Sequence, residues 1–311
     1  MSFNGVGKSN NSFSGYTQPN ETLSRKTVNE DLSVFTPKIP VIDDFTTKCM
    51  DIDGDGKGDV SHGRVVVDMI KGIAPNAEIT EFNVYDDKTH AISNEKIEAA
   101  YNKILERTTK GEHFDGVNMS IGSETTIDKP DGTSVMLESS KTLTGISYKT
   151  NKHILRNNLF SAKTNIISVM EEVAKNTPIY VAAGNPENGT NYISQYALGK
   201  GVISVGAADS HGKPLEGYSA MCDKYGNPDH PVFLIMKENG RPSRDKDGNV
   251  LFDVNGDNKP DYTSADMADP SYSKKHVPGP FVNLIQGVSF STPTVFMEDL
   301  KAKWQKQHKT Q

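Results

Sequence analysis

Short apolar runs alternate with helix-like segments along the chain from about residue 38. Residues 39–42 form a run suited to a buried strand, and residues 62–73 place Val65, Val66 and Met69 at helical spacing. The alternation continues, with strands expected at 78–85, 115–121, 178–183 and 201–207, and helices at 93–109, 163–176 and from Ser289 to the C-terminus. Strands separated by helices of this length form βαβ units. The sequence therefore predicts an α/β fold, a three-layer sandwich with a mostly parallel central sheet and helices on both faces.

A single domain is expected over residues 38–311. Residues 1–37 are rich in Ser, Asn, Thr and Gly, which is typical of a flexible polar tail or a short pro-segment. Polar stretches near 123–160 and 209–280 interrupt the alternation, and we interpret both as insertions. The first suits a β-hairpin, and the second contains the apolar run 232–236.

The charge balance and the absence of long apolar runs limit the classes of partner. The net charge of -6 argues against binding to a nucleic-acid backbone, which requires a basic surface. No run approaches the roughly 20 apolar residues that span a bilayer, and no apolar core of a secretory signal is visible. We therefore expect no membrane span, and either a cytoplasmic location or export by a non-Sec route. Only Cys49 and Cys222 are present, so free thiols and a single bridge both remain open.

Four polar residues follow apolar runs or open helices, in the order Asp43, His62, Asn185 and Ser289. Ligands of parallel α/β sheets lie at the carboxyl ends of strands, near helix N-termini, so these residues can converge there. They are the acid, base, amide donor and hydroxyl that acyl transfer by a serine nucleophile needs. Each also has a plain structural interpretation: a strand-end turn, an exposed helix start, a Gly-Asn-Pro turn and a helix N-cap, respectively. Their joint order on suitable elements favours the catalytic interpretation.

The segments around these residues resemble those of the subtilase family, the subtilisin-like serine proteases of the peptidase S8 type. The order acid, base, serine is also that of subtilisin. The resemblance covers roughly residues 38–300 and is most specific at 116–122 (GVNMSIG) and 287–293 (GVSFSTP). Residues 61–63 (SHG), 73–77 (IAPNA) and 182–185 (AAGN) match further family motifs.

The resemblance implies a role for each residue. Ser289 would be the nucleophile, His62 the general base and Asp43 the acid that orients the imidazole, while Asn185 would contribute to the oxyanion hole. Two strand ends would flank the substrate and shape the primary specificity pocket: Ser120, Ile121 and Gly122, and Ala182, Ala183 and Gly184.

The chain also departs from the family pattern near the reacting groups. Phe45 stands where a glycine usually follows the acid, so the choice between Asp43 and Asp44 stays open. The other departures replace small residues or flank the reacting groups: Arg64, Asp68, Pro186 and Val288. None of them removes a reacting group.

Two Asp-rich segments have the spacing of the first part of an EF-hand calcium loop. The candidate oxygen ligands are Asp51, Asp53, Asp55 and Asp59 in the first segment, and Asp253, Asn255, Asp257 and Asp261 in the second. Neither segment has the glutamate expected at position 12, so Asp/Gly-rich turns that bind nothing tightly are the alternative. Calcium is the only cofactor that the sequence suggests.

We therefore predict a monomeric serine endopeptidase that acts on peptide or protein substrates. Two alternatives remain from the sequence. The first is a catalytically weak or inactive protein that uses the subtilase fold for binding. The second is a calcium-binding structural or adhesion protein in which Ser289 is only a helix cap.

Overall fold

The computed structural model describes part of the chain. Within several strands it describes the backbone but not the side chains. The described residues are 35–50, 58, 60–122, 126–128, 134–136, 165–184, 194–208, 214, 222–226, 229–235, 237–238, 241–249, 251–253, 260, 262–263 and 281–308. The predicted tail 1–37 thus lies outside the described residues except for its last three positions.

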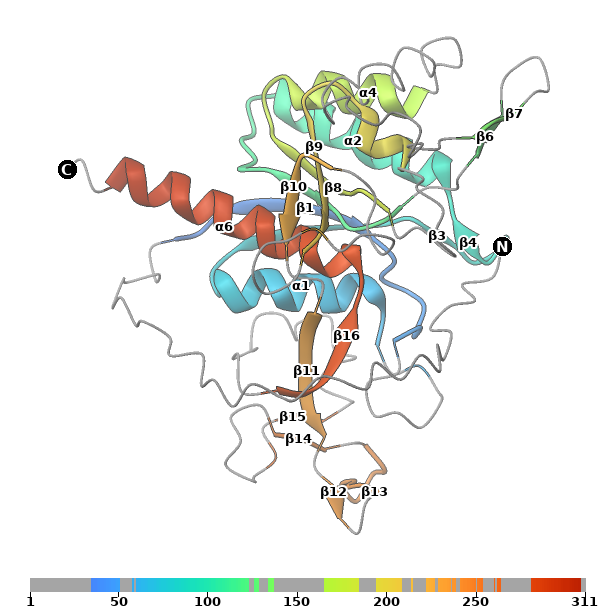
Figure 1. The fold of residues 1–311 in the computed structure, drawn as a ribbon, viewed down its shortest axis with the longest axis vertical. Coiled ribbons are helices and arrows are strands. Elements are labelled where there is room, and N and C mark those ends of the chain that lie inside the picture. Colours follow the sequence, from blue (N-terminus) through green and yellow to red (C-terminus); the bar gives the residue numbers. More distant parts are fainter. Residues whose placement is uncertain are drawn as a thin grey trace.

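A six-stranded sheet in the order β10-β9-β8-β5-β1-β2 forms the centre of the fold (Figure 1). Its strands are β1 (Lys38–Asp43), β2 (Glu78–Asn83), β5 (Val117–Met119), β8 (Ile179–Ala182), β9 (Val202–Ala207) and β10 (Lys224–Gly226). Every neighbouring pair is parallel. The predicted α/β fold with a mostly parallel sheet is therefore confirmed. Strand β10 was not predicted from the sequence, because this short strand lies at the sheet edge and is polar.

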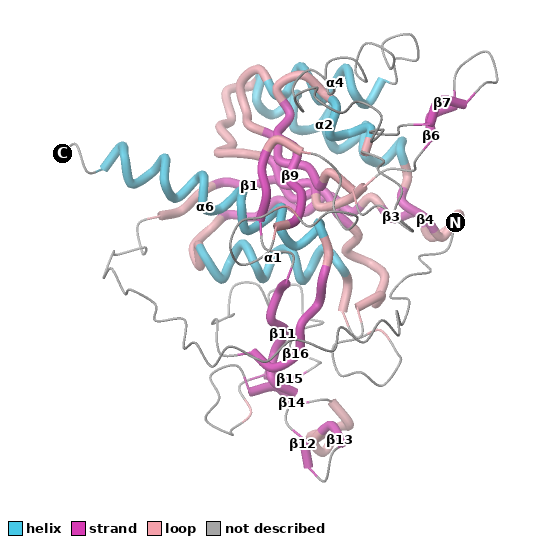
Figure 2. Tube along the Cα trace, viewed as in Figure 1, coloured by secondary structure: helices cyan, strands magenta, loops and turns pink. Residues whose placement is uncertain are grey.

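Helices cover both faces of the sheet, as Figures 1 and 2 show. Among the described residues, the helices that pack on it are α1 (His62–Ile73), α2 (Asn94–Thr109), α4 (Asn165–Ala174) and α6 (Val288–His308). One apolar core joins α2 and α4 to the sheet, and a second core joins α1 and α6 to its other face. In β1, Ile42 belongs to the first core and Val41 to the second, as the alternation of side chains along a strand requires.

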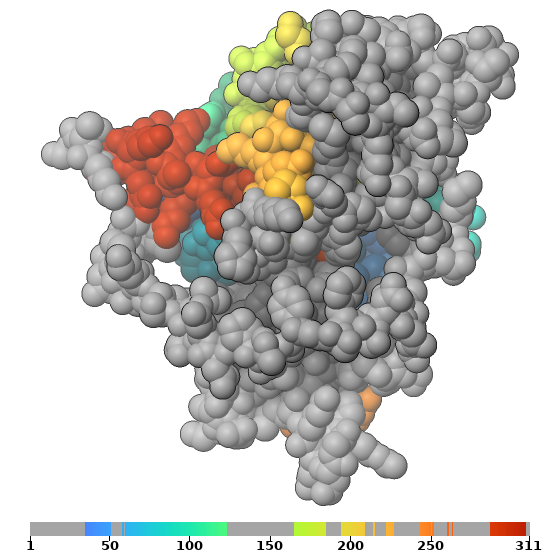
Figure 3. Space-filling model, in the orientation of Figure 1, coloured from blue at the N-terminus to red at the C-terminus, as the bar shows by residue number. Residues whose placement is uncertain are grey.

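The long final helix is fastened to the sheet by polar contacts as well as by its apolar face. Tyr180 of β8 donates from its hydroxyl to Asp299 Oδ2 at 2.6 Å, and Lys224 of β10 reaches Asp299 Oδ1 at 2.6 Å. In the space-filling view, α6 lies on the surface beside the segment that includes β10 (Figure 3). These contacts fix the helix whose first turn carries Ser289.

A second sheet, of four strands in the order β15-β14-β11-β16, lies outside the parallel sheet. Its strands are β11 (Asp229–Ile235), β14 (Leu251–Asp253), β15 (Tyr262–Thr263) and β16 (Phe281–Gln286), and all their pairings are antiparallel. The apolar run that precedes Ser289 is thus β16 and is not a strand of the parallel sheet. An apolar run can form either kind of strand, so the sequence did not distinguish them.

The remaining elements are short. They are the strand pairs β3 (Tyr85–Asp86) with β4 (Ala91–Ile92), β6 (Thr126–Asp128) with β7 (Ser134–Met136), and β12 (Lys237–Glu238) with β13 (Arg241–Pro242), and the 3-10 helix η2 (Gln195–Leu198). The β6–β7 pair lies within the stretch interpreted as an insertion. Within the described part of the chain, no helix has the length and apolar character needed to cross a membrane.

Candidate active site

Asp43 is the last residue of β1, and its side chain is buried. The strand runs between β2 and β5, so the carboxylate emerges at the carboxyl edge of the parallel sheet. The backbone carbonyl of Asp43 accepts a hydrogen bond from Val84 N at 3.0 Å, just beyond β2. The sheet therefore fixes the backbone from which the carboxylate projects.

His62 is the first residue of α1 and lies against Asp43. The helix begins here because Ser61 caps it, its Oγ accepting from Arg64 N at 3.3 Å. His62 Nδ1 lies 2.7 Å from Asp43 Oδ1, a hydrogen-bond distance. Because this contact occupies Nδ1, the other ring nitrogen, Nε2, is the one suited to exchange a proton with a hydroxyl.

Two opposing influences set the proton affinity of the imidazole. Burial alone would lower the pKa of His62. The charge of Asp43, its hydrogen bond to the ring and the charge of Asp44 outweigh this, so the pKa of His62 is raised above its usual value. Asp43 Oδ2 is itself buried and has no hydrogen-bond partner within the described residues. The histidine and its carboxylate partner therefore form a tightly coupled pair.

Gly63 allows Asp43 and His62 to approach each other. Its N–H donates to Asp44 O at 2.8 Å. A Cβ at this position would lie 2.7 Å from that oxygen and 2.9 Å from Asp43 Cβ, closer than real Cβ atoms come. A glycine after His62 is thus needed for the first turn of α1 to contact the end of β1.

Ser289 lies in the first turn of α6 and is half-buried. The ring of the next residue, Phe290, packs against the imidazole of His62 with 5.2 Å between ring centroids. Ser291 Oγ donates to Gly226 O at 3.2 Å, which ties this turn to β10. The structure therefore brings the segment that carries Ser289 against His62.

The strand ends predicted to bind substrate are neighbours. β5 and β8 pair in parallel, and the ideal Cβ position of Gly122 lies 3.9 Å from Gly184 Cα. Ser120 is fully buried and accepts a hydrogen bond from Asn118 Nδ2 at 2.9 Å. The other predicted members are Ile121, Ala182 and Ala183, all buried beside them. Gly184 has φ 116°, and the adjacent Asn185 lies outside the described residues.

The predicted calcium ligands also lie outside the described residues, except Asp253, whose backbone belongs to β14. Met50 and Val60, which flank the first Asp-rich segment, exchange backbone hydrogen bonds of 3.0 and 3.3 Å. Among described side chains, no group of three or more His, Cys, Asp or Glu could hold a metal. Cys49 and Cys222 are both free thiols.

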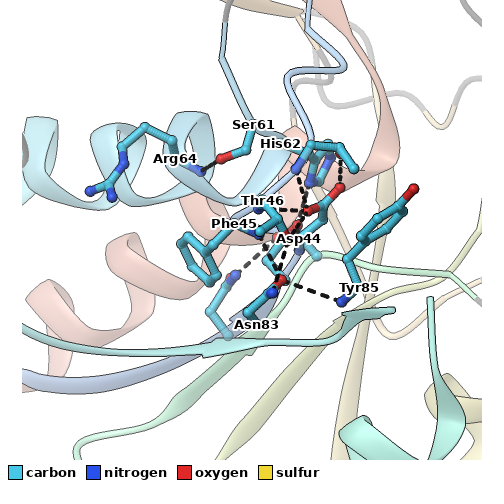
Figure 4. A network of polar contacts seen from close by, with 12 residues as sticks. Asp44, Phe45, Thr46, Ser61, His62, Arg64, Asn83 and Tyr85 are labelled. Carbon is cyan, nitrogen blue, oxygen red and sulfur yellow. Dashed lines mark hydrogen bonds and ion pairs between the residues drawn. The ribbon is translucent and has the colours of Figure 1, made fainter. Parts of the chain in front are cut away.

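A polar turn after β1 contributes residues that sequence reasoning did not assign (Figure 4). Asp44 Oδ1 accepts from Thr46 N at 2.8 Å and from Thr47 N at 3.0 Å, so this carboxylate closes its own turn. Asn83, at the end of β2, holds the same turn from the neighbouring strand. Asp43 is therefore the carboxylate that contacts His62, and Asp44 supports it. No sequence signal marked Asn83, because the strand expected at 78–85 continues past it, whereas β2 ends at Asn83.

A protein-family model, described as the subtilase family (Peptidase S8), matches residues 53–295. The chain belongs to the subtilase family. The matched range includes His62, Asn185 and Ser289 and begins after Asp43. By this membership the chain is a serine peptidase.

The solved structures that this subtilase resembles include a lanthipeptide protease and two maturation proteases. A lanthipeptide protease aligns with a TM-score of 0.44 and 19% identity, over 88% of this chain and 76% of that chain. The patellamide maturation protease aligns with a TM-score of 0.44 and 16% identity, over 85% of this chain and 77% of that chain. The prenylagaramide maturation protease aligns with a TM-score of 0.39 and 16% identity, over 86% of this chain and 76% of that chain. Among curated proteins, none matches the sequence.

Proposed function

We propose that this subtilase is a serine endopeptidase in which Asp43, His62 and Ser289 form the catalytic triad. The observation that carries the proposal is the 2.7 Å contact between Asp43 Oδ1 and His62 Nδ1, together with the packing of Phe290 on the imidazole. The contact orients the base, and the packing brings the first turn of α6 to it. Family membership supplies the serine chemistry.

In the proposed reaction, Ser289 Oγ attacks a peptide carbonyl while His62 Nε2 takes the hydroxyl proton. Asp43 holds the tautomer with the proton on Nδ1 and stabilises the imidazolium that forms. The tetrahedral intermediate then collapses, and His62 returns the proton to the leaving amine. Water, deprotonated by the same imidazole, hydrolyses the acyl-enzyme and releases Ser289.

The negative charge of the tetrahedral intermediate needs donors in place before the reaction. Ser289 lies in the first turn of α6, where backbone N–H groups have no partner within the helix. Its N–H is therefore suited to donate to the oxyanion, and the proposal assigns the second donor to the side chain of Asn185. In subtilisin, loss of the oxyanion-hole asparagine costs about 10²–10³ in kcat. We expect a loss of the same sign from Asn185→Ala in this chain.

A fluorophosphonate probe tests the proposal, since it labels only a serine activated by its base. We expect the wild type to be labelled, and Ser289→Ala and His62→Ala not to be. A peptide library should be cleaved at internal bonds by the wild type only. Folded wild type that is neither labelled nor active on peptides would instead support a subtilase fold used for binding.

We also propose that the Asp-rich segment 51–59 binds calcium. Carboxylate oxygens at EF-hand spacing suit this hard cation, and repel one another without one. The hydrogen bonds between Met50 and Val60 bring the two ends of the segment together, as a closed ligand loop requires. Only Val60 separates the segment from Ser61, the N-cap of α1, so calcium would stabilise the start of the helix that carries His62.

A further inference from the structure

Asn83 lies at the end of β2, in register with Asp43 at the end of the neighbouring β1. Its Oδ1 accepts from Phe45 N at 3.1 Å and from Tyr85 N at 3.3 Å. Its Nδ2 donates to Thr46 Oγ1 at 2.8 Å. One exposed amide thus joins the chain leaving β1 to the chain leaving β2 (Figure 4).

The turn that Asn83 holds contacts both members of the acid–base pair. Asp44 N donates at 2.8 Å to Asp43 Oδ1, the same oxygen that lies 2.7 Å from His62 Nδ1. Asp44 O accepts from Gly63 N at 2.8 Å, at the first turn of α1. A shift of this turn would therefore move the carboxylate oxygen and the start of the helix relative to each other.

We propose that Asn83 is a positioning residue that fixes the turn of Asp44–Thr46 and thereby the contact between Asp43 and His62. The inference rests on the proposed function, in which that pair activates Ser289. Asn83 itself touches no reacting atom. Its amide is suited to the task because it supplies an acceptor for two backbone N–H groups and a donor for a hydroxyl at once.

The groups around His62 determine how displacement of the turn would change the pKa of His62. The charges of Asp43, at the end of β1, and Asp44, in the turn, act on the ring; the thiol of Cys49 contacts the His62 backbone, and Phe290 packs on the ring from α6. The two carboxylates raise the pKa of His62, whereas burial lowers it. If the Asp43 contact loosens while the ring stays buried, the pKa of His62 should fall.

The test compares Asn83→Ala with Asn83→Asp and with Asn102→Ala, a control at an exposed position on α2. Asn83→Ala removes all three hydrogen bonds. Asn83→Asp keeps the acceptor oxygen, and the Thr46 hydroxyl can turn to donate to the new carboxylate. Active sites are titrated with a fluorophosphonate, and kcat, KM and the pH profile of kcat/KM are measured per labelled site.

We expect Asn83→Ala to lower kcat about 10–100-fold with KM nearly unchanged, since a small misplacement of reacting groups has effects of this size. The acid limb of its kcat/KM profile should move to lower pH. Asn83→Asp should recover most of kcat, with an acid limb at or above that of the wild type. Asn102→Ala should match the wild type.

Wild-type kcat and an unchanged acid limb per labelled site in Asn83→Ala would overturn the proposal. So would a loss of kcat in Asn83→Asp equal to that in Asn83→Ala. An unlabelled wild type, by contrast, refutes the proposed function itself, so the two failures are distinguishable.

Discussion

Replacement of Asp68 by asparagine should stabilise this protein. Asp68 lies on α1, is 5% exposed, and neither of its carboxylate oxygens has a hydrogen-bond partner within the described residues. Arg64, one turn earlier, instead pairs with Glu81, with 3.2 Å between Nη1 and Oε1. Burial raises the pKa of Asp68 well above its usual value; the charge of Arg64 opposes this rise, and that of Glu81 adds to it. The ionised form of Asp68 is therefore destabilising in the folded protein.

The size of the effect follows from the unpaired oxygens. A buried polar group without a partner costs about 1–3 kcal/mol, and more when charged. The asparagine amide keeps the neutral part of this cost but cannot ionise, so Asp68→Asn should raise the free energy of unfolding at pH 8 by the excess cost of the charge, about 1.4 kcal/mol for each tenfold rise in the proton affinity of Asp68 on folding. By the size scaling for large domains, each 1 kcal/mol corresponds to roughly 2–4 °C in Tm.

The gain should depend on pH with a definite sign. Because the pKa of Asp68 is higher in the folded than in the unfolded state, the folded state binds more protons between the two values. The contribution of Asp68 to the free energy of unfolding of the wild type therefore falls as pH rises from the ordinary carboxyl pKa to the raised pKa. The advantage of Asp68→Asn should be smallest near the ordinary carboxyl pKa and grow toward alkaline pH.

Urea unfolding from pH 4.5 to 8, in a Ser289→Ala background that prevents self-digestion, measures this difference. Asp87→Asn, at an exposed position after β3, is the matched control and should change little. The reasoning is refuted if Asp68→Asn is no more stable than its parent at pH 8, or if its gain is the same at every pH.

Three further predictions follow from the site. Gly63→Ala should destabilise the protein by about 1–3 kcal/mol, because the clash of the new Cβ with Asp44 O outweighs a helix-propensity gain of about 1 kcal/mol. The same clash should slow fluorophosphonate labelling, and unchanged labelling would contradict this. A thiol reagent at pH 8 should modify exposed Cys49 before buried Cys222. Burial raises the pKa of both thiols, that of Cys222 to about 12, so Cys222 should react only when denaturant is added; equal rates for the two thiols would contradict this. Chelation by EGTA should lower both Tm and activity if segment 51–59 binds calcium, with recovery on adding calcium back; no change in either would exclude that site.

The sequence alone predicted most of the central elements, because their signals are local. Apolar periodicity placed α1 at residues 62–73, and the structure has α1 at His62–Ile73. The strand expected at 115–121 is shorter, at Val117–Met119, since hydrogen bonding to β1 and β8 decides where a strand ends. Local pattern and motif together were enough to predict the α/β fold and the family.

Tertiary structure decided what depends on contacts between distant segments. The sequence left Asp43 and Asp44 open, and only the packing of α1 on the end of β1 places Asp43 against His62. Asn83 lies 40 residues after Asp43, and only the register of two parallel strands makes it a neighbour. Asp68 stands out in the sequence only as a departure from the family motif, and its cost comes from the burial of α1. Periodicity is a property of a short stretch of chain, whereas register and burial are fixed only when the layers pack together.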